Sequence, residues 1–227
     1  MATWDNHTVT DEHLLPYVDS STAPPDIKAA LQTLPFERNI FKVRLTHALY
    51  IRGANQAKGL LANSKIFFKP FMTLLSSGWG EGRQVRSTDW QVIVLRTAAS
   101  LNAPYEWDVN EPVARIFGFT EEHFAALRKT SEPLPEALFT PRQRLLGRIT
   151  ERLCLGNKIS KELFLEAKGT FSDEEIAEIF YLQGIYSLLA RFMNSAQIDF
   201  DPPIPGLEDS LRKYNAHAIE KEKQYKD

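Results

Sequence analysis

The sequence predicts an all-α protein, and three observations support that prediction. Apolar residues recur at helical spacing along most of the 227 residues. Alternating apolar and polar stretches bounded by hairpin turns are missing, which disfavours an all-β fold. Several segments open with residue pairs that cap helices, and glycine or proline follows where the helices should end. We therefore expect helices packed around one core.

The first half of the chain predicts an arm, three helices and a loop. Residues 1–38 contain four prolines, which favours an extended arm with one short helix at 25–34. A strong helix is expected at 39–61 and a weaker one at 66–75. Residues 76–87 are rich in glycine and predict a loop, although they lack the glycine order of a phosphate-binding loop.

Capping signals mark the helices of the second half. Thr88 and Gln91 have the spacing of a capping box, which opens the first of these helices. The next helix begins near Ala103, contains Pro112, which should kink it, and is expected to end at Gly118. Further helix starts are predicted at three capping residues: Thr120, Thr140 and Ser172.

These elements suggest a helical body at residues 39–200 and a charged tail at 201–227, which is either a weakly amphipathic helix or disordered. The formal charge of −2 and the lack of a basic run give no reason to expect nucleic acid or an anionic membrane as a partner. The N-terminal residues lack the order of a signal peptide, and no apolar run reaches membrane-spanning length. We expect a cytoplasmic protein.

Metal, cofactor and disulfide chemistry find no support in the sequence. Cys154 is the single cysteine, and its position between Leu153 and Leu155 predicts a packed structural thiol. The five histidines are scattered and match no metal-ligand spacing. We therefore expect no metal and no cofactor.

Residues 103–110 carry the most chemical information. Glu106 and Asn110 lie four positions apart, on one face of the predicted helix, and Tyr105 and Trp107 flank the carboxylate. The helix N-terminus favours a charged carboxylate, whereas burial against aromatic rings favours the neutral acid. Such opposing influences tune general acids and bases. Glu106 and Asn110 are the candidate catalytic residues.

Each candidate also has a purely structural explanation. Glu106 could stabilise the helix dipole and do nothing more, and Asn110 could simply bond to Glu106 or a neighbouring carbonyl. Gln91 is a candidate substrate-binding residue that a capping box would also explain. Tyr105 and Trp107 are candidate substrate contacts, or else core or interface residues.

Two stretches resemble a known family. Residues 89–110 read DWQVIVLRTAASLNAPYEWDVN, and GFTEE follows at 118–122. Together they resemble the carboxymuconolactone decarboxylase superfamily, which includes the alkylhydroperoxidase D proteins. Residues 140–194 look like the C-terminal helices of the same family. The resemblance covers roughly residues 39–200 and implies an all-α fold, assembly into a homo-oligomer such as a dimer or trimer, and activities from decarboxylation and lactone chemistry to peroxide reduction.

Departures from the family pattern narrow the expected activity. In the peroxidase branch, two cysteines, a histidine and a glutamate form the proton relay, and the matching positions here hold Ala103, Glu106, Asn110 and Gln91. A thiol peroxidase needs both thiols, so the resemblance implies a non-redox branch. In the decarboxylase-like branch the glutamate of Tyr105-Glu106-Trp107 is present, but a histidine is usual at the position of Asn110.

The sequence therefore predicts a cofactor-free enzyme in which Glu106 performs general acid/base chemistry on a small cyclic or enolisable substrate, as in secondary-metabolite or aromatic-degradation pathways. Decarboxylation, lactone opening or closing, and isomerisation stay open, because all pass through an enol or enolate. His47, within the predicted 39–61 helix, is a further candidate for substrate binding, or a core histidine. The alternative is a catalytically inactive binding or assembly protein that kept the fold but lost the usual histidine and cysteines.

Overall fold

A computed structural model of the chain describes residues 13–16, 18–19, 23–31, 58–59, 61–78, 80 and 82–225. These residues form two compact units, and the domain organisation expected from the sequence stays a prediction. The first unit contains the described residues of Glu81–Phe192 and Pro205–Asp227. The second contains those of Asp5–Gly80 and Met193–Ile204.

The described residues confirm the all-α fold class, since the only strands among them are two short ones of two residues each, which pair with each other. The elements of the first unit, which shares α8 with the second, are α3 (Ser87–Ser100), α4 (Pro104–Ile116), α5 (Glu121–Arg128), α6 (Pro141–Leu155), α7 (Lys161–Thr170), α8 (Asp173–Ala196), α9 (Leu207–Tyr214) and α10 (Ala216–Glu222). No described helix is both long enough and apolar enough to cross a membrane.

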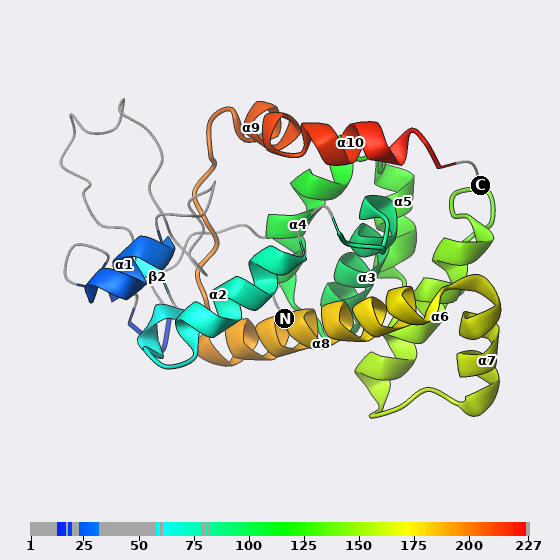
Figure 1. The fold of residues 1–227 in the computed structure, drawn as a ribbon, viewed down its shortest axis with the longest axis horizontal. Coiled ribbons are helices and arrows are strands. Elements are labelled where there is room, and N and C mark those ends of the chain that lie inside the picture. Colours follow the sequence, from blue (N-terminus) through cyan, green and yellow to red (C-terminus); the bar gives the residue numbers. More distant parts are fainter. Residues whose placement is uncertain are drawn as a thin grey trace. The chain divides into compact units, whose positions relative to one another are not determined.

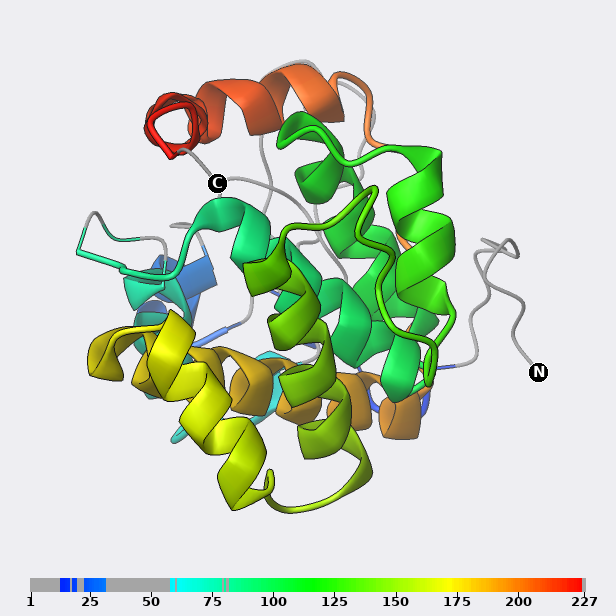
Figure 2. The same cartoon turned by 90° about the vertical axis from the view of Figure 1, so that its right-hand side faces the viewer.

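Helix α3 is the centre of the first unit. It packs against α4, α5, α6 and α10, and Figure 2 shows α6 in front of it and α10 beside its N-terminal end. All residues from 89 to 98 are buried. A helix buried on every side must be apolar nearly all round, as the run 92–95 is. Its buried polar residues, Asp89, Gln91, Arg96 and Thr97, stand out against that background.

Most of the predicted helix boundaries in this unit are confirmed. Thr140 and Gln143 form a reciprocal capping box at the start of α6, and Thr120 forms one with His123 at the start of α5. Ser172 and Glu175 bond each other in the same way at the start of α8. Gly118, with a φ of 93°, follows the end of α4, and Pro112 lies inside that helix.

The capping box predicted at Thr88 and Gln91 is wrong. Helix α3 begins two residues earlier than a cap at Thr88 would place it, at Ser87, and its cap residue, Arg86, makes no side-chain capping hydrogen bond. Glu222 of α10 takes that role: one carboxylate oxygen accepts the backbone N–H of Ser87 at 2.5 Å, and the other accepts the hydroxyl of Thr88 at 3.0 Å. A carboxylate is well placed there because the first N–H groups of a helix lack partners and carry partial positive charge.

The tail at 201–227, for which the sequence leaves helix and disorder open, forms helices in its described part. Figure 1 shows α9 (orange) followed directly by α10 (red). Helix α9 packs against α4 and α10 packs against α3, so both belong to the first unit.

The second unit holds the shorter elements. They are β1 (Val18–Asp19), α1 (Pro25–Leu31), β2 (Lys58–Gly59), a 3-10 turn (Leu61–Asn63) and α2 (Phe68–Ser77). A small cluster of Ile27, Ala62, Phe68 and Met72 forms its core. The short helices expected at 25–34 and 66–75 appear as α1 and α2. The helix predicted at 39–61 lies outside the described residues except near its end, where β2 pairs with β1 instead.

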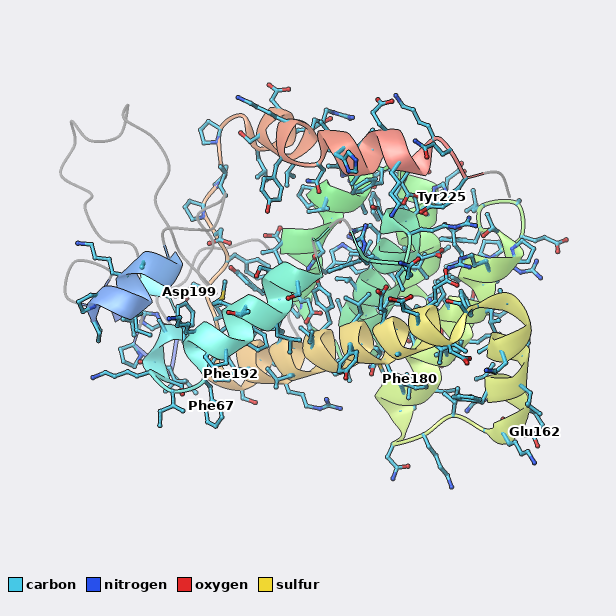
Figure 3. The ribbon with its side chains drawn as sticks, in the orientation of Figure 1. Phe67, Glu162, Phe180, Phe192, Asp199 and Tyr225 are labelled. Atoms are coloured by element: carbon cyan, nitrogen blue, oxygen red, sulfur yellow. The ribbon has the colours of Figure 1, made fainter. Side chains whose placement is uncertain are left out.

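Arg142 of α6 connects three helices of the first unit. Its Nε donates to Asp89 of α3 at 2.5 Å, and a terminal nitrogen donates to Glu175 of α8 at 2.5 Å. Burial raises the pKa of Asp89 to about 6, although Arg142 beside it favours the charged carboxylate. The guanidinium also covers the ring of Phe171 at 4.4 Å. Phe180 of α8, labelled in Figure 3, stacks on Phe164 of α7.

Replacing Arg142 with Met should destabilise the protein by about 3–5 kcal/mol, because it leaves the buried Asp89 without its ionic partner. Urea unfolding at neutral pH, followed by helical circular dichroism, measures the loss. The control is Arg144→Met on the same helix, which breaks an ion pair with the exposed Glu136 and should cost less than about 1 kcal/mol. Equal losses in the two variants would contradict the role assigned to Arg142.

Candidate functional site

Glu106 occupies the first turn of α4 and is only 1% exposed. Helix α4 starts there because Pro104 favours the first helical position, where no N–H is needed. Both carboxyl oxygens of Glu106 are buried, and neither has a hydrogen-bond partner among the described residues. Burial therefore raises the pKa of Glu106 well above its ordinary value. Of the two opposing influences seen in the sequence, burial is the stronger, and it favours the neutral acid.

Trp90 of α3 and Tyr186 of α8 form a buried pair close to Glu106. The indole N–H of Trp90 donates to the Tyr186 hydroxyl at 3.0 Å, and the two rings meet edge to face with centroids 6.2 Å apart. Trp90 is 1% exposed and Tyr186 is 5% exposed. Burial raises the pKa of the Tyr186 phenol, the Trp90 hydrogen bond lowers it, and the neighbouring Glu106 raises it further. Three helices therefore bring the carboxyl group and the phenol together.

Arg83 lies against Trp90 and comes from the predicted glycine-rich loop. Its guanidinium stands 4.8 Å from the centre of the Trp90 ring and donates to the Ser87 hydroxyl at 2.7 Å. Burial lowers the pKa of Arg83, although the carboxylates of Glu222 and Glu178 favour its charged form. The Glu178 carboxylate also accepts two backbone N–H groups, that of Gln84 at 2.9 Å and that of Val85 at 2.7 Å. This end of the loop is thereby fixed beside the aromatic pair.

Asn110 and Gln91 differ from each other in how their amides are used. Asn110 is half-buried, and its side-chain N–H donates to the backbone carbonyl of Glu106 at 2.7 Å. This contact is the structural alternative that the sequence left open. Gln91 is 2% exposed and takes no part in a capping box, and its side-chain oxygen has no donor among the described residues. Because buried polar atoms are nearly always paired, Gln91 remains a candidate for substrate binding.

Tyr105 and Trp107 are both buried within the first unit. The Trp107 indole donates to Glu111 at 2.6 Å, its ring meets Phe124 edge to face, and the Arg128 guanidinium covers it at 4.7 Å. These contacts give Trp107 a packing role between α4 and α5. Substrate contact by either aromatic residue stays a prediction. The other predicted substrate-binding residue, the histidine at position 47, lies outside the described residues.

Cys154 on α6 has the surroundings of a structural thiol. It is half-buried, and the side-chain amide of Gln183 donates to its sulfur at 3.4 Å. Burial raises the pKa of the Cys154 thiol, which keeps it protonated and a poor nucleophile. Within the described part of the chain, no group of three or more His, Cys, Asp or Glu side chains could hold a metal ion.

Sequence reasoning identified Glu106 but missed Tyr186 and Trp90. A buried tyrosine or tryptophan usually needs a hydrogen-bond partner for its polar atom. The sequence therefore indicates that Tyr186 and Trp90 each need a partner, if they are buried. Nothing in the sequence connects them, because they are separated by 96 positions and belong to different helices.

Comparisons with known proteins identify the fold. No protein-family model matches the sequence, and no curated protein matches it. Solved structures do match. A peroxidase-related protein with an alkylhydroperoxidase AhpD core, from Ralstonia eutropha JMP134, is 16% identical, with 89% of this chain and 96% of that chain covered and a TM-score of 0.63. A peroxidase-related protein from Silicibacter sp. TM1040 is 13% identical, with 93% and 100% covered and a TM-score of 0.60.

A third similar structure is a variant of the debrominase Bmp8 in complex with 2,3,4-tribromopyrrole. It is 14% identical to this chain, with 92% of this chain and 99% of that chain covered and a TM-score of 0.60. The chain therefore has the helical fold of the AhpD-like proteins, which confirms the resemblance seen in the sequence. At these identities the likeness establishes the fold alone.

Replacing Glu106 with Gln should raise the free energy of unfolding, and the gain should grow with pH. Below about 4.5 the carboxyl is protonated in both states, and the substitution has little effect. Above that value the unfolded state loses the proton that the folded state keeps, so rising pH favours unfolding of the wild type by about 1.4 kcal/mol per pH unit until the raised pKa is reached. Urea unfolding of both proteins across this range measures the difference.

The matched control for this experiment is Glu122→Gln, which changes an exposed carboxylate in the first turn of α5. Its effect on stability should vary little with pH. If the Glu106→Gln variant showed the same flat dependence, Glu106 would not be the buried neutral acid described above.

Proposed function

We propose that this chain is an enzyme of the AhpD-like fold in which Glu106 acts as a general acid on a small cyclic or enolisable substrate, without a cofactor and without thiol chemistry. The observation that supports this most directly is the state of Glu106, which is buried and whose two carboxyl oxygens have no partner among the described residues. An unpaired buried polar group costs about 1–3 kcal/mol of stability. Groups that break the pairing rule in this way are typical of functional sites.

The neutral form of Glu106 is suited to proton donation. Its pKa lies well above the ordinary value, so the group keeps its proton where an exposed glutamate has lost it. A neutral acid also does not repel a substrate that carries a carboxylate. Both properties favour reactions in which an enol or enolate must be protonated.

Decarboxylation of a β-keto acid illustrates the chemistry. The bond between the carboxylate and the α carbon breaks, CO₂ leaves, and the electron pair moves onto the carbonyl oxygen as an enolate. Glu106 then gives its proton to the α carbon, and a proton from solvent restores the acid. Lactone opening or closing and isomerisation pass through related enols, so Glu106 can act in the same way in each.

The same residues argue against peroxide chemistry. The two positions that match the thiols of the peroxidase branch hold Ala103 and Glu106, and the chain has a single cysteine. That cysteine, Cys154, has a raised pKa and packs against Gln183. A similar solved protein, the debrominase, was captured with a brominated pyrrole, which is a small ring compound, and this supports a small cyclic substrate here.

A catalytically inactive binding or assembly protein is the competing hypothesis. Only an enzyme needs a titratable proton at Glu106, whereas a scaffold would be served equally well by a paired or apolar side chain. The two hypotheses therefore differ in what Glu106→Gln does to turnover, and not only in what it does to stability.

Wild-type protein should turn over at least one member of a panel of lactones and β-keto acids, and Glu106→Gln should lower kcat on it about 100-fold or more. The rate should fall as pH rises through the raised pKa of Glu106, because the acid form is the donor. Product analysis by liquid chromatography measures both. Glu122→Gln is the control and should keep the wild-type rate. Unchanged turnover in Glu106→Gln would refute the proposal, and binding without turnover by wild-type protein would favour the inactive scaffold.

Peroxide should not be consumed in a thiol-dependent way. With hydrogen peroxide or an organic hydroperoxide and a dithiol reductant, wild-type protein and Cys154→Ser should show the same background rate, because no second thiol exists to resolve a sulfenic acid. A rate well above background that disappears in Cys154→Ser would place the protein in the peroxidase branch instead.

A further inference from the structure

The hydroxyl group of Tyr186 uses only part of its hydrogen-bonding capacity. Its oxygen accepts the indole N–H of Trp90 at 3.0 Å, but no described residue accepts the phenolic hydrogen. A phenol is both a donor and an acceptor, and buried side chains normally use both roles. The donor of Tyr186 is therefore available to a group that the described residues do not supply.

Trp90 fixes the position of the phenol through two contacts. Trp90 holds its oxygen from α3, and the edge-to-face contact between the rings limits the tilt of the phenol. The Trp90 ring is in turn covered by the guanidinium of Arg83 at 4.8 Å, and Arg83 is bonded to Ser87. A donor held in this way needs little reorganisation when charge develops next to it.

Glu106 is a neighbour of the phenol, because the charge of its ionised form raises the pKa of Tyr186. The two groups have complementary states. Glu106 carries a proton that it can transfer, whereas burial raises the pKa of Tyr186 so far that the phenol keeps its proton and acts only as a hydrogen-bond donor. The hydrogen bond that the phenol oxygen accepts from the Trp90 indole also polarises the phenol, and this makes its O–H a stronger hydrogen-bond donor.

We propose that Tyr186 is a second catalytic residue of the Glu106 site, and that it donates a hydrogen bond to the substrate oxygen on which negative charge develops. The inference rests on the proposed function of Glu106 and defines the substrate class further. The substrate is a carbonyl compound, either a ketone or a lactone, whose oxygen becomes an enolate oxygen during the reaction. Tyr186 stabilises that oxygen and keeps its own proton, while Glu106 supplies the proton that goes to carbon.

The first test is kinetic. Tyr186→Phe keeps the ring that packs on Trp90 but removes the donor, and it should lower kcat about 100-fold or more on the substrate found for the wild type, with a much smaller change in KM. The matched control is Tyr181→Phe on the same helix, at a side chain that is 66% exposed, which should leave both constants unchanged. Wild-type kcat in Tyr186→Phe, with Glu106→Gln inactive, would overturn the role of Tyr186 and leave that of Glu106 standing.

The second test needs no turnover. A cyclic 1,3-diketone such as cyclohexane-1,3-dione is an enolate at neutral pH and resembles the charged intermediate. Isothermal titration calorimetry should show that wild-type protein binds it, that Tyr186→Phe weakens binding about tenfold or more, and that the control Tyr181→Phe, at an exposed side chain, binds it like the wild type. Equal affinity in wild type and Tyr186→Phe, or no binding by the wild type, would overturn the inference. Loss of turnover in Glu106→Gln remains the separate criterion for the proposed function.

Discussion

The guanidinium of Arg96 is the interaction on which the first unit depends. Arg96 is completely buried, yet its terminal nitrogens donate to the carbonyls of Ala126 at 3.0 Å, Leu127 at 2.8 Å and Glu132 at 2.7 Å, and it pairs with Glu151. Two of those carbonyls belong to the last turn of α5, where the helix end carries partial negative charge. Asp89 lies seven residues before Arg96, on the same face of α3, and pairs with α6 as Arg96 does. These two contacts fix the rotation of α3, and that rotation directs Trp90 toward Tyr186.

The buried polar groups of α3 and α4 are of two kinds, those with ionic partners and those without a described partner. On α3, Asp89 and Arg96 are neutralised by ionic partners, as stability requires. Gln91 and Glu106, on α3 and α4, retain buried oxygens that no described residue satisfies. Because α3 and α4 pack against each other, the unsatisfied groups lie within one well-packed region and not at a frayed edge. The Nε of Arg96 and the hydroxyls of Thr97, Ser100 and Thr150 are also buried without a partner among the described residues. Glu106 differs from these groups because it is a carboxyl group whose pKa is raised by burial.

Features of the structure that depend on residues close in sequence could be predicted, whereas those that depend on contacts between distant helices could not. Helices and their caps at Thr140 and Ser172 were predictable, because a capping box involves residues three positions apart. The cap of α3 was not, since its carboxylate arrives from α10. Glu106 was predictable as a tuned acid because its aromatic neighbours are adjacent in sequence, but the outcome of the competition between dipole and burial required the packed structure. The aromatic pair beside it depends on the contact of α3 with α8, which no local pattern encodes.

The carboxylate that caps α3 also links the order of synthesis to the order of folding. Glu222 follows Ser87 by 135 residues, so the first turn of the central helix emerges from the ribosome long before its cap exists. Until α10 has been made, the N–H groups at that end can bond only to water or to temporary partners. Closing so long a loop is slow compared with forming a local helix. The N-terminal cap of α3 can therefore form only after nearly all the helices that pack against α3 have been synthesised. In a nascent chain arrested before α10, the first turn of α3 would lack this cap.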